Sequence, residues 1–213
     1  TLSLYQSLGG ELVDDQQRPI LQPDVLKEVL KLYADGTEAG VFADWLSQYS
    51  SDNQVWEVFR DERADLLVTW SSSFLTEIPA DSTILPLPRF SAEAKDFTIA
   101  DGWLWAFCDE DIEKRKTSIQ LAEYLVESGF LADWSEEAAY VPPRPSALGS
   151  WANKSLVTIL SQIAVSAEIQ PSSQITVSVG PVLQGAVQQM IDQQGDPGQA
   201  AQAAAEQILA PTY

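Results

Sequence analysis

Strand-like runs alternate with helix-like segments through the middle of the chain. The run "DLLVTW" (65–70) is apolar almost throughout, which is typical of a strand buried on both faces. "STILPLPRF" (82–90) predicts a second short strand, which Pro86 and Pro88 confine to the end or the edge of a sheet. "FTIADGWLWAF" (97–107) predicts a third strand. Strands alternating with helices indicate an α/β fold that is helix-rich, because three strands are few for 213 residues.

Apolar residues at helical spacing predict the helices. One helix is expected from Pro23 to Ala34, with Gly36 just past its end, and another after a cap at Ser51 or Asp52. Its inward residues would be Val55, Trp56 and Phe59. The later helices are expected at about 110–127, 130–134, 151–167, 179–195 and 196–209. The first of these would bury Ile112, Ile119, Leu121, Ala122 and Leu125, and the last would be capped by Asp196. An irregular loop is expected over "AYVPPRPSALGSW" (139–151), because proline occupies three of the four positions from Pro142 to Pro145.

Composition excludes several kinds of chemistry. The chain has no histidine, which removes Ser-His-Asp and Cys-His catalysis and histidine-ligated zinc. We interpret the single cysteine, Cys108, as a small buried hydrophobe. No cluster has the spacing of metal ligands, and no glycine-rich phosphate loop occurs, so no metal or cofactor is expected. The net charge of −19 is spread along the chain and disfavours nucleic acid and anionic membrane surfaces as partners.

Several aromatic residues stand at the ends of predicted elements or in loops. They are Tyr5, Trp70, Trp103, Tyr140 and Trp151. An aromatic face stacks on the apolar face of a sugar, and nearby polar groups satisfy the sugar hydroxyls. Ligands of open α/β sheets bind at strand ends, where Trp70, Ser71 and Ser72 and the group Asp101, Gly102 and Trp103 are expected. These residues predict a carbohydrate site, with core packing as the alternative for each tryptophan.

The ordered segments resemble a known family. They are "GGELVDDQQRPIL", "WEVFRDERADLLVTWSSSF", "LPLPRF", "DGWLWAF", "KRKTSIQLAEYLVESGFLADWSEEAAYVPPRPSAL" and "GPVLQGAVQQMI". Together they look like the later half of an extracellular solute-binding protein of a sugar-type ABC importer, the branch that includes the maltose-binding proteins. The resemblance implies a periplasmic-binding-protein-like type II fold, in which two lobes joined by a hinge enclose a sugar and deliver it to a membrane permease. It also implies an extracytoplasmic location and a membrane tether, such as the lipid anchor of a lipoprotein.

The resemblance further implies how the chain is divided. Residues 1–98 would form part of the second lobe, 99–168 would belong to the first lobe, and 169–213 would return to the second. Asp101 and Gly102 would form a hinge corner at the cleft, where glycine tolerates an unusual backbone. Trp103 would face the ligand, while Trp105 and Phe107 would be core residues.

Five further site residues follow from the family pattern. Trp70, Ser71 and Ser72 would lie at the lip of the second lobe, and Tyr140 and Arg144 would reach in from the loop "AYVPPR". The Arg144 guanidinium would either bind two ligand acceptors or hold its own loop.

The resemblance covers an incomplete fold, because the early strands and helices of the first lobe have no counterpart. The segment 98–167 would then expose an apolar surface. Either the chain is a fragment, or that portion has been lost, or a second copy covers the gap as a homodimer.

Two other functions remain open. A carbohydrate-active enzyme or its accessory domain would need a carboxylate pair, and Asp44, Asp101, Glu136 and Glu137 are available. No motif raises any two of them above the other acidic positions, so no catalytic residue is predicted. The second alternative is a protein-interaction scaffold that uses the exposed apolar face.

Overall fold

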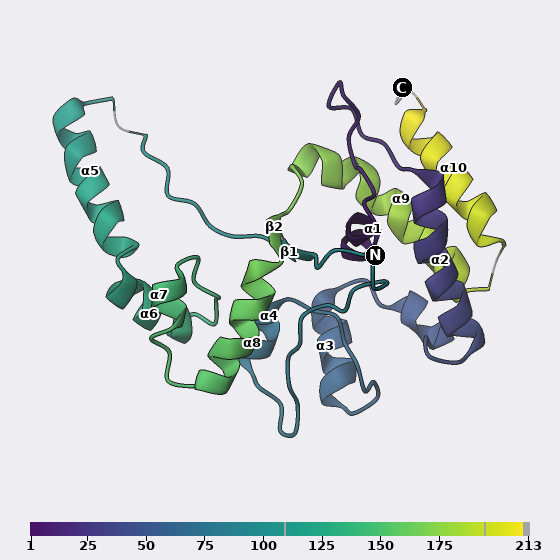
Figure 1. Ribbon diagram of the computed structural model, residues 1–213, viewed down its shortest axis with the longest axis horizontal. Helices are drawn as coiled ribbons and strands as arrows, with labels where there is room; N and C mark the ends of the chain where they lie inside the picture. Colours follow the sequence, from purple (N-terminus) through teal and green to yellow (C-terminus); the bar gives the residue numbers. More distant parts are fainter. Residues whose placement is uncertain (109, 194, 211–213) are drawn as a thin grey trace. The chain divides into compact units, whose positions relative to one another are not determined.

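The described part of the chain is helical with one small two-stranded sheet. The computed structural model describes residues 1–108, 110–193 and 195–210, without the side chain of Asp44 (Figure 1). Its elements are α1 (Leu2–Ser7), α2 (Pro23–Glu38), η1 (Asp44–Gln48), α3 (Asp52–Arg60), α4 (Ser71–Thr76), β1 (Thr98–Ala100), α5 (Ile112–Leu125), α6 (Ser128–Glu137), α7 (Pro145–Leu148), α8 (Lys154–Val165), β2 (Ala167–Ile169), α9 (Ser173–Ile191) and α10 (Pro197–Leu209). Strands β1 and β2 pair in parallel. The helix-rich expectation is confirmed.

The chain divides into two compact units. Unit 1 comprises Thr1–Val55, Pro88–Ile99 and Glu168–Tyr213, and unit 2 comprises Trp56–Leu87 and Ala100–Ala167. The chain therefore passes from one unit to the other within α3, between Leu87 and Pro88, within β1 and within β2.

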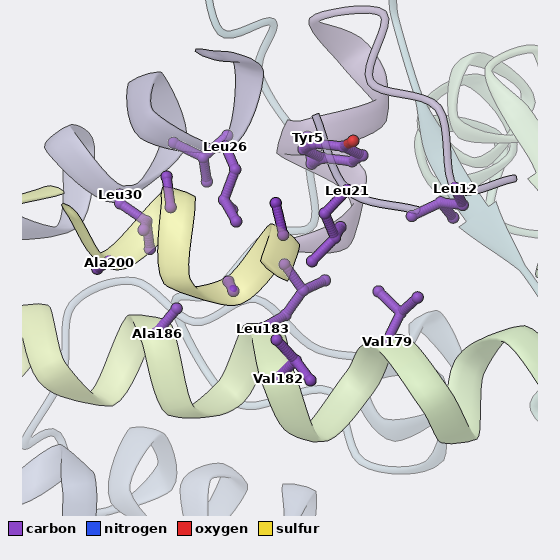
Figure 2. Packing of buried hydrophobic residues seen from close by; sticks show 14 of the residues in the cluster. Tyr5, Leu12, Leu21, Leu26, Leu30, Val179, Val182, Leu183, Ala186 and Ala200 are labelled. Carbon is purple, nitrogen blue, oxygen red and sulfur yellow. The ribbon is translucent and has the colours of Figure 1, made fainter. Parts of the chain in front are cut away.

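The core of unit 1 lies where α2, α9 and α10 pack together. Leu26 and Leu30 of α2 are fully buried and point toward Leu183 and Ala186 of α9 and Ala200 of α10 (Figure 2). Four alanines of α10 are buried there, namely Ala200, Ala201, Ala204 and Ala205. Because alanine is small, α10 can lie close to α2. The predicted cap of α10 is confirmed: Asp196 accepts hydrogen bonds from the backbone N–H groups of Gly198 (2.8 Å) and Gln199 (3.0 Å).

Unit 2 has a smaller core. Leu131 and Ala132 of α6 pack with Ala147 and Leu148 of α7 and with Trp151 and Leu160 at α8. The α7 helix begins at Pro145, inside the loop that was expected to be irregular. Proline is well suited to the first position of a helix, because the N–H that it lacks would have no helical partner there.

The end of α2 corrects one prediction. Gly36 lies inside the helix, which continues to Glu38. A Cβ atom at Gly36 would lie 2.5 Å from the ring of Phe42, so the glycine is needed for close packing and not for the helix end. The residue with the left-handed backbone conformation that often follows a helix is Gly40, two residues after the end of α2, where φ is 75°.

The strand predictions were mostly wrong. Residues 65–70 and 82–90, all of which the structure describes, contain no strand, and Leu66 and Val68 are exposed. The third predicted strand is reduced to Thr98–Ala100. An extended segment becomes a strand only where it pairs with another strand. The partner of this segment, β2, is only three residues long, so only Thr98–Ala100 can pair.

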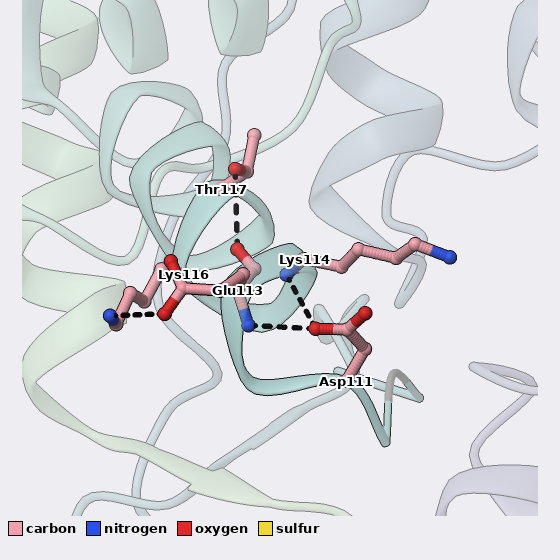
Figure 3. A network of polar contacts seen from close by, with 5 residues as sticks. All are labelled: Asp111, Glu113, Lys114, Lys116 and Thr117. Atoms are coloured by element: carbon pink, nitrogen blue, oxygen red, sulfur yellow. Dashed lines mark hydrogen bonds and ion pairs between the residues drawn. The ribbon is translucent and has the colours of Figure 1, made fainter.

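The α5 helix forms as predicted but buries none of its residues. Ile112 and Ile119 lie on one side of the helix and Leu121 on the opposite side, so no single apolar stripe exists. Polar contacts of its first turns stabilise it instead: Asp111 accepts hydrogen bonds from the N–H groups of Glu113 (2.9 Å) and Lys114 (3.4 Å), and the Lys116 ammonium lies 2.7 Å from the Glu113 carboxylate (Figure 3).

The α3 helix buries a different residue from those predicted. Val58 is its buried residue, and Val55, Trp56 and Phe59 are half-buried. Its C-terminus has the hydrogen bonds of a Schellman motif, from Glu62 N–H to the Phe59 carbonyl (3.1 Å) and from Arg63 N–H to the Val58 carbonyl (3.0 Å).

Replacing Glu62 with glycine is expected to stabilise the protein by about 1 kcal/mol, because a residue with a Cβ atom is strained in the left-handed region. Glu62 is exposed and has φ of 56°. Thermal unfolding followed by circular dichroism measures the gain. Glu62→Ala is the control, since it removes the same charge and keeps the Cβ atom. Equal melting temperatures for the two variants would contradict the prediction.

Candidate functional site

The first predicted site group lies at the start of α4. Trp70 is the residue before the helix and its side chain is half-exposed, while Ser71 and Ser72 occupy the first turn. The Trp70 carbonyl accepts a hydrogen bond from Ser73 N–H (3.1 Å), and the Ser72 carbonyl accepts one from the Thr76 hydroxyl (2.8 Å). These contacts fix the turn that presents the Trp70 ring.

The second group follows β1. The Asp101 carboxylate accepts a hydrogen bond from Gly102 N–H (2.8 Å), and Trp103 is 84% exposed. Gly102 is not in the left-handed region, and a Cβ atom there would meet nothing within 4 Å. The expectation of an unusual backbone at this glycine was therefore wrong.

The residues after Trp103 also differ from the expectation. Trp105 and Phe107 are exposed, so their interpretation as core residues was wrong, and Cys108 is exposed rather than buried. Residues 101–108 have no regular structure. Alternation can place two rings on one side of a segment, but the rings are buried only if another element packs on that side.

The third group flanks the connection between α6 and α7, two helices that pack together. The Tyr140 ring is stacked with Trp134, with centroids 6.3 Å apart and ring planes 5° from parallel. Arg144 is exposed and precedes α7, and its carbonyl accepts hydrogen bonds from the N–H groups of Ala147 (3.0 Å) and Leu148 (3.1 Å).

All the predicted site residues belong to unit 2, and they come from three separate places in it. Tyr140 and Arg144 share one inter-helix connection, and Asp101, Gly102 and Trp103 are consecutive. Trp134 is a neighbour of Tyr140 that the sequence analysis did not select. The signal that could have found it is the "WSEEAAY" spacing, which brings the tryptophan and the tyrosine together if the helix ends between them.

The chemical character of these residues is aromatic and polar without a metal centre. In the part of the chain that the structure describes, no group of three or more Cys, Asp or Glu side chains could hold a metal ion. The described helices are also too short or too polar to span a membrane. The groups available to a ligand are thus ring faces, hydroxyls, carboxylates and a guanidinium.

Unit 1 contains a separate cavity of about 470 Å³ that is lined by α9, η1 and the start of α1. Leu46, Val179 and Leu183 supply apolar walls, and Gln184 and Gln188 supply polar ones. None of the predicted site residues lines this cavity.

Comparison with known proteins gives the family. The sequence model described as bacterial extracellular solute-binding protein matches residues 2–158, which is most of the chain. A comparison with curated proteins finds no match. The chain therefore belongs to the bacterial extracellular solute-binding proteins, the non-enzymatic solute-binding components of ABC import systems.

Proposed function

We propose that the imported solute is a carbohydrate, either an oligosaccharide or a sugar derivative, and that aromatic side chains of unit 2 bind it. The observation that carries this proposal is the exposure of Trp70 just before α4, of Trp103 after β1 and of Tyr140 after α6. Folding gains nothing from leaving large aromatic rings in water, whereas a sugar offers an apolar face of matching size.

Polar groups stand beside these rings. The Asp101 carboxylate lies two residues before Trp103, the hydroxyls of Ser71 and Ser72 follow Trp70, and the exposed Arg144 guanidinium lies beyond Tyr140. Carboxylates accept hydrogen bonds from sugar hydroxyls and a guanidinium donates them. Each ring therefore has the kind of neighbour that a polyhydroxy ligand requires.

The division into lobes is part of the proposal. Residues 1–98 and 169–213 would form the second lobe, and 99–168 would contribute to the first. The boundaries of the compact units between Ile99 and Ala100 and between Ala167 and Glu168 support this division. Residues Trp56–Leu87 belong to unit 2, although the proposal assigns them to the second lobe.

The partners follow from the family. Its members are extracellular, and the solute passes to an ABC permease in the membrane. We propose in addition that the protein is tethered to the membrane, as a lipoprotein is, because a tether keeps a binding protein near its permease.

Replacing Trp103 with alanine tests the proposal. We expect the affinity for a bound saccharide to fall about tenfold, while the melting temperature stays the same because an exposed ring contributes little to folding. Isothermal titration calorimetry and thermal unfolding measure the two quantities. Leu104→Ala is the matched control, since Leu104 is the adjacent residue, is 94% exposed and has no ring. Equal affinities for the two variants would refute the role of Trp103.

A second candidate function rests on the exposed segment that contains Trp103, Leu104, Trp105 and Phe107. A second copy of the chain, or another protein, could cover this segment, since contiguous exposed apolar side chains are typical of interfaces. Sedimentation velocity over a range of concentrations distinguishes a homodimer from a monomer. A stable complex that is insensitive to saccharides would favour a scaffold over a sugar-binding protein.

A further inference from the structure

Two aromatic side chains near the C-terminal end of α6 remain open to solvent, Trp134 in its last turn and Tyr140 just beyond it. Trp134 is 46% exposed and Tyr140 is 42% exposed. Their ring planes are within 5° of parallel and their centroids are 6.3 Å apart. Rings in direct face-to-face contact have centroids only about 3.5–4.0 Å apart, so these two rings do not fully cover each other's faces.

The backbone holds this pair in place. Tyr140 N–H donates to the Ser135 carbonyl (2.9 Å) and Ala139 N–H donates to the Glu136 carbonyl (3.3 Å), which is the Schellman pattern. Ala139 has φ of 60°, a strained conformation for a residue with a Cβ atom. A hydrophobic contact between the positions that Tyr140 and Trp134 occupy normally accompanies this motif. An aliphatic side chain at either position would be enough for that contact, so the motif does not require two aromatic rings.

The helix beneath the pair is held by buried side chains and by hydrogen bonds. Leu131, Ala132 and Ser135 are buried on its inner side. Its N-terminus is capped by the Glu127 carboxylate, which accepts a hydrogen bond from Gly129 N–H (2.9 Å), and the Ser128 and Ser146 hydroxyls, 2.7 Å apart, connect α6 to α7. The two rings are thus positioned before any ligand arrives, which lowers the entropy that binding must overcome.

The aromatic surface extends beyond the pair. Phe130 lies one turn before Trp134 on α6, and residues four apart are neighbours on a helix surface. The ring of Tyr124, from α5, lies with its centroid 5.1 Å from that of Phe130. We name these four residues, Tyr124, Phe130, Trp134 and Tyr140, the aromatic strip. The exposed carboxylates of Asp133 and Glu137 flank Trp134, one residue before it and three after it.

We propose that the aromatic strip binds successive sugar rings of an oligosaccharide, with Trp134 as a ligand contact beside Tyr140. This inference rests on the proposed function. A single sugar ring covers one aromatic face and leaves the rest of the strip unused, whereas a chain of sugars uses several faces at once. The flanking carboxylates accept hydrogen bonds from the sugar hydroxyls. The protein therefore prefers oligosaccharides to monosaccharides.

The test is calorimetric titration of the whole chain with glucose, maltose, maltotriose and maltopentaose and with the corresponding cello- and xylo-saccharides. In the series that binds, affinity is expected to increase with chain length. Trp134→Ala is expected to weaken binding of the longer saccharides about tenfold and to change monosaccharide binding much less. Trp134→Phe, which keeps a ring, restores part of the affinity.

Two variants separate recognition from folding. Trp134→Leu keeps an apolar contact with Tyr140 at the helix end but has no ring, so it must weaken binding as Trp134→Ala does while melting near the wild-type temperature. Trp105→Ala removes an exposed indole outside the strip and is expected to bind as the wild type. Wild-type affinity of Trp134→Leu for the longer saccharides would overturn the proposal and leave the proposed function standing. If no saccharide binds to the wild type, the proposed function itself fails.

Discussion

Replacing Leu30 with alanine is expected to lower the free energy of unfolding of unit 1 by about 2–5 kcal/mol. Leu30 is fully buried and lies at the contact of α2 with α9 and α10. The buried residues of α10 in this core are alanines, whose short side chains cannot move to fill the space that the leucine leaves. The truncation therefore loses both the transfer free energy of the leucine and the contacts around the new cavity.

Urea unfolding followed by far-ultraviolet circular dichroism measures this loss, because unit 1 contains the long helices α2, α9 and α10. The matched control is Leu32→Ala, on the same helix but with an exposed side chain. Tryptophan fluorescence follows mainly the other unit, since Trp45 lies in unit 1 and the remaining six of the 7 tryptophans lie in unit 2. Similar stability losses for Leu30→Ala and Leu32→Ala would contradict the core described for unit 1.

Replacing Gly10 with alanine is expected to destabilise unit 1 by about 2–4 kcal/mol, because the added methyl group overlaps a buried ring. A Cβ atom at Gly10 would lie 2.5 Å from atoms of the Tyr5 ring. That ring cannot move freely: its hydroxyl donates to the Glu11 carbonyl (2.8 Å) and accepts from Gln22 N–H (2.8 Å). Burial also raises the pKa of the Tyr5 phenol above its ordinary value, so the hydroxyl keeps its proton at neutral pH.

Chemical unfolding of Gly10→Ala measures the effect. Gly185→Ala is the control, because a Cβ atom at Gly185 of α9 meets open space and alanine favours the helix. We expect this control to be as stable as the wild type or slightly more stable. Wild-type stability of Gly10→Ala would show that the chain around Tyr5 is looser than the structure indicates.

The helices could be predicted because their signals are local. The Asp196 cap and the alanine spacing define α10 without reference to any other element. The helix end at Gly36 was misplaced because the reason for that glycine is its contact with Phe42, which the spacing of apolar residues does not reveal. The strands were overpredicted for a similar reason, since apolar character suits an extended segment and pairing requires a second segment.

The role of the candidate site residues stays a prediction, but the structure shows their environment, which the sequence did not reveal. Trp103 is exposed as a ligand contact must be, but Trp105 and Phe107 are exposed as well. Their burial would depend on an element packing on one side of residues 101–108, which the alternation itself cannot show. Trp134 was missed because its contact with Tyr140 depends on the residue at which α6 ends, and helix ends are the least local part of a helix prediction.

The most direct test of the carbohydrate assignment is a titration of intrinsic tryptophan fluorescence with mono- and oligosaccharides. Trp70, Trp103 and Trp134 all lie in unit 2 with open faces, so a sugar stacking on any of them changes the emission. We predict a saturable change with one class of saccharide, which Trp103→Ala weakens. A flat response across the whole panel, with no heat of binding in calorimetry, would contradict the carbohydrate assignment and leave the family membership as the only functional conclusion.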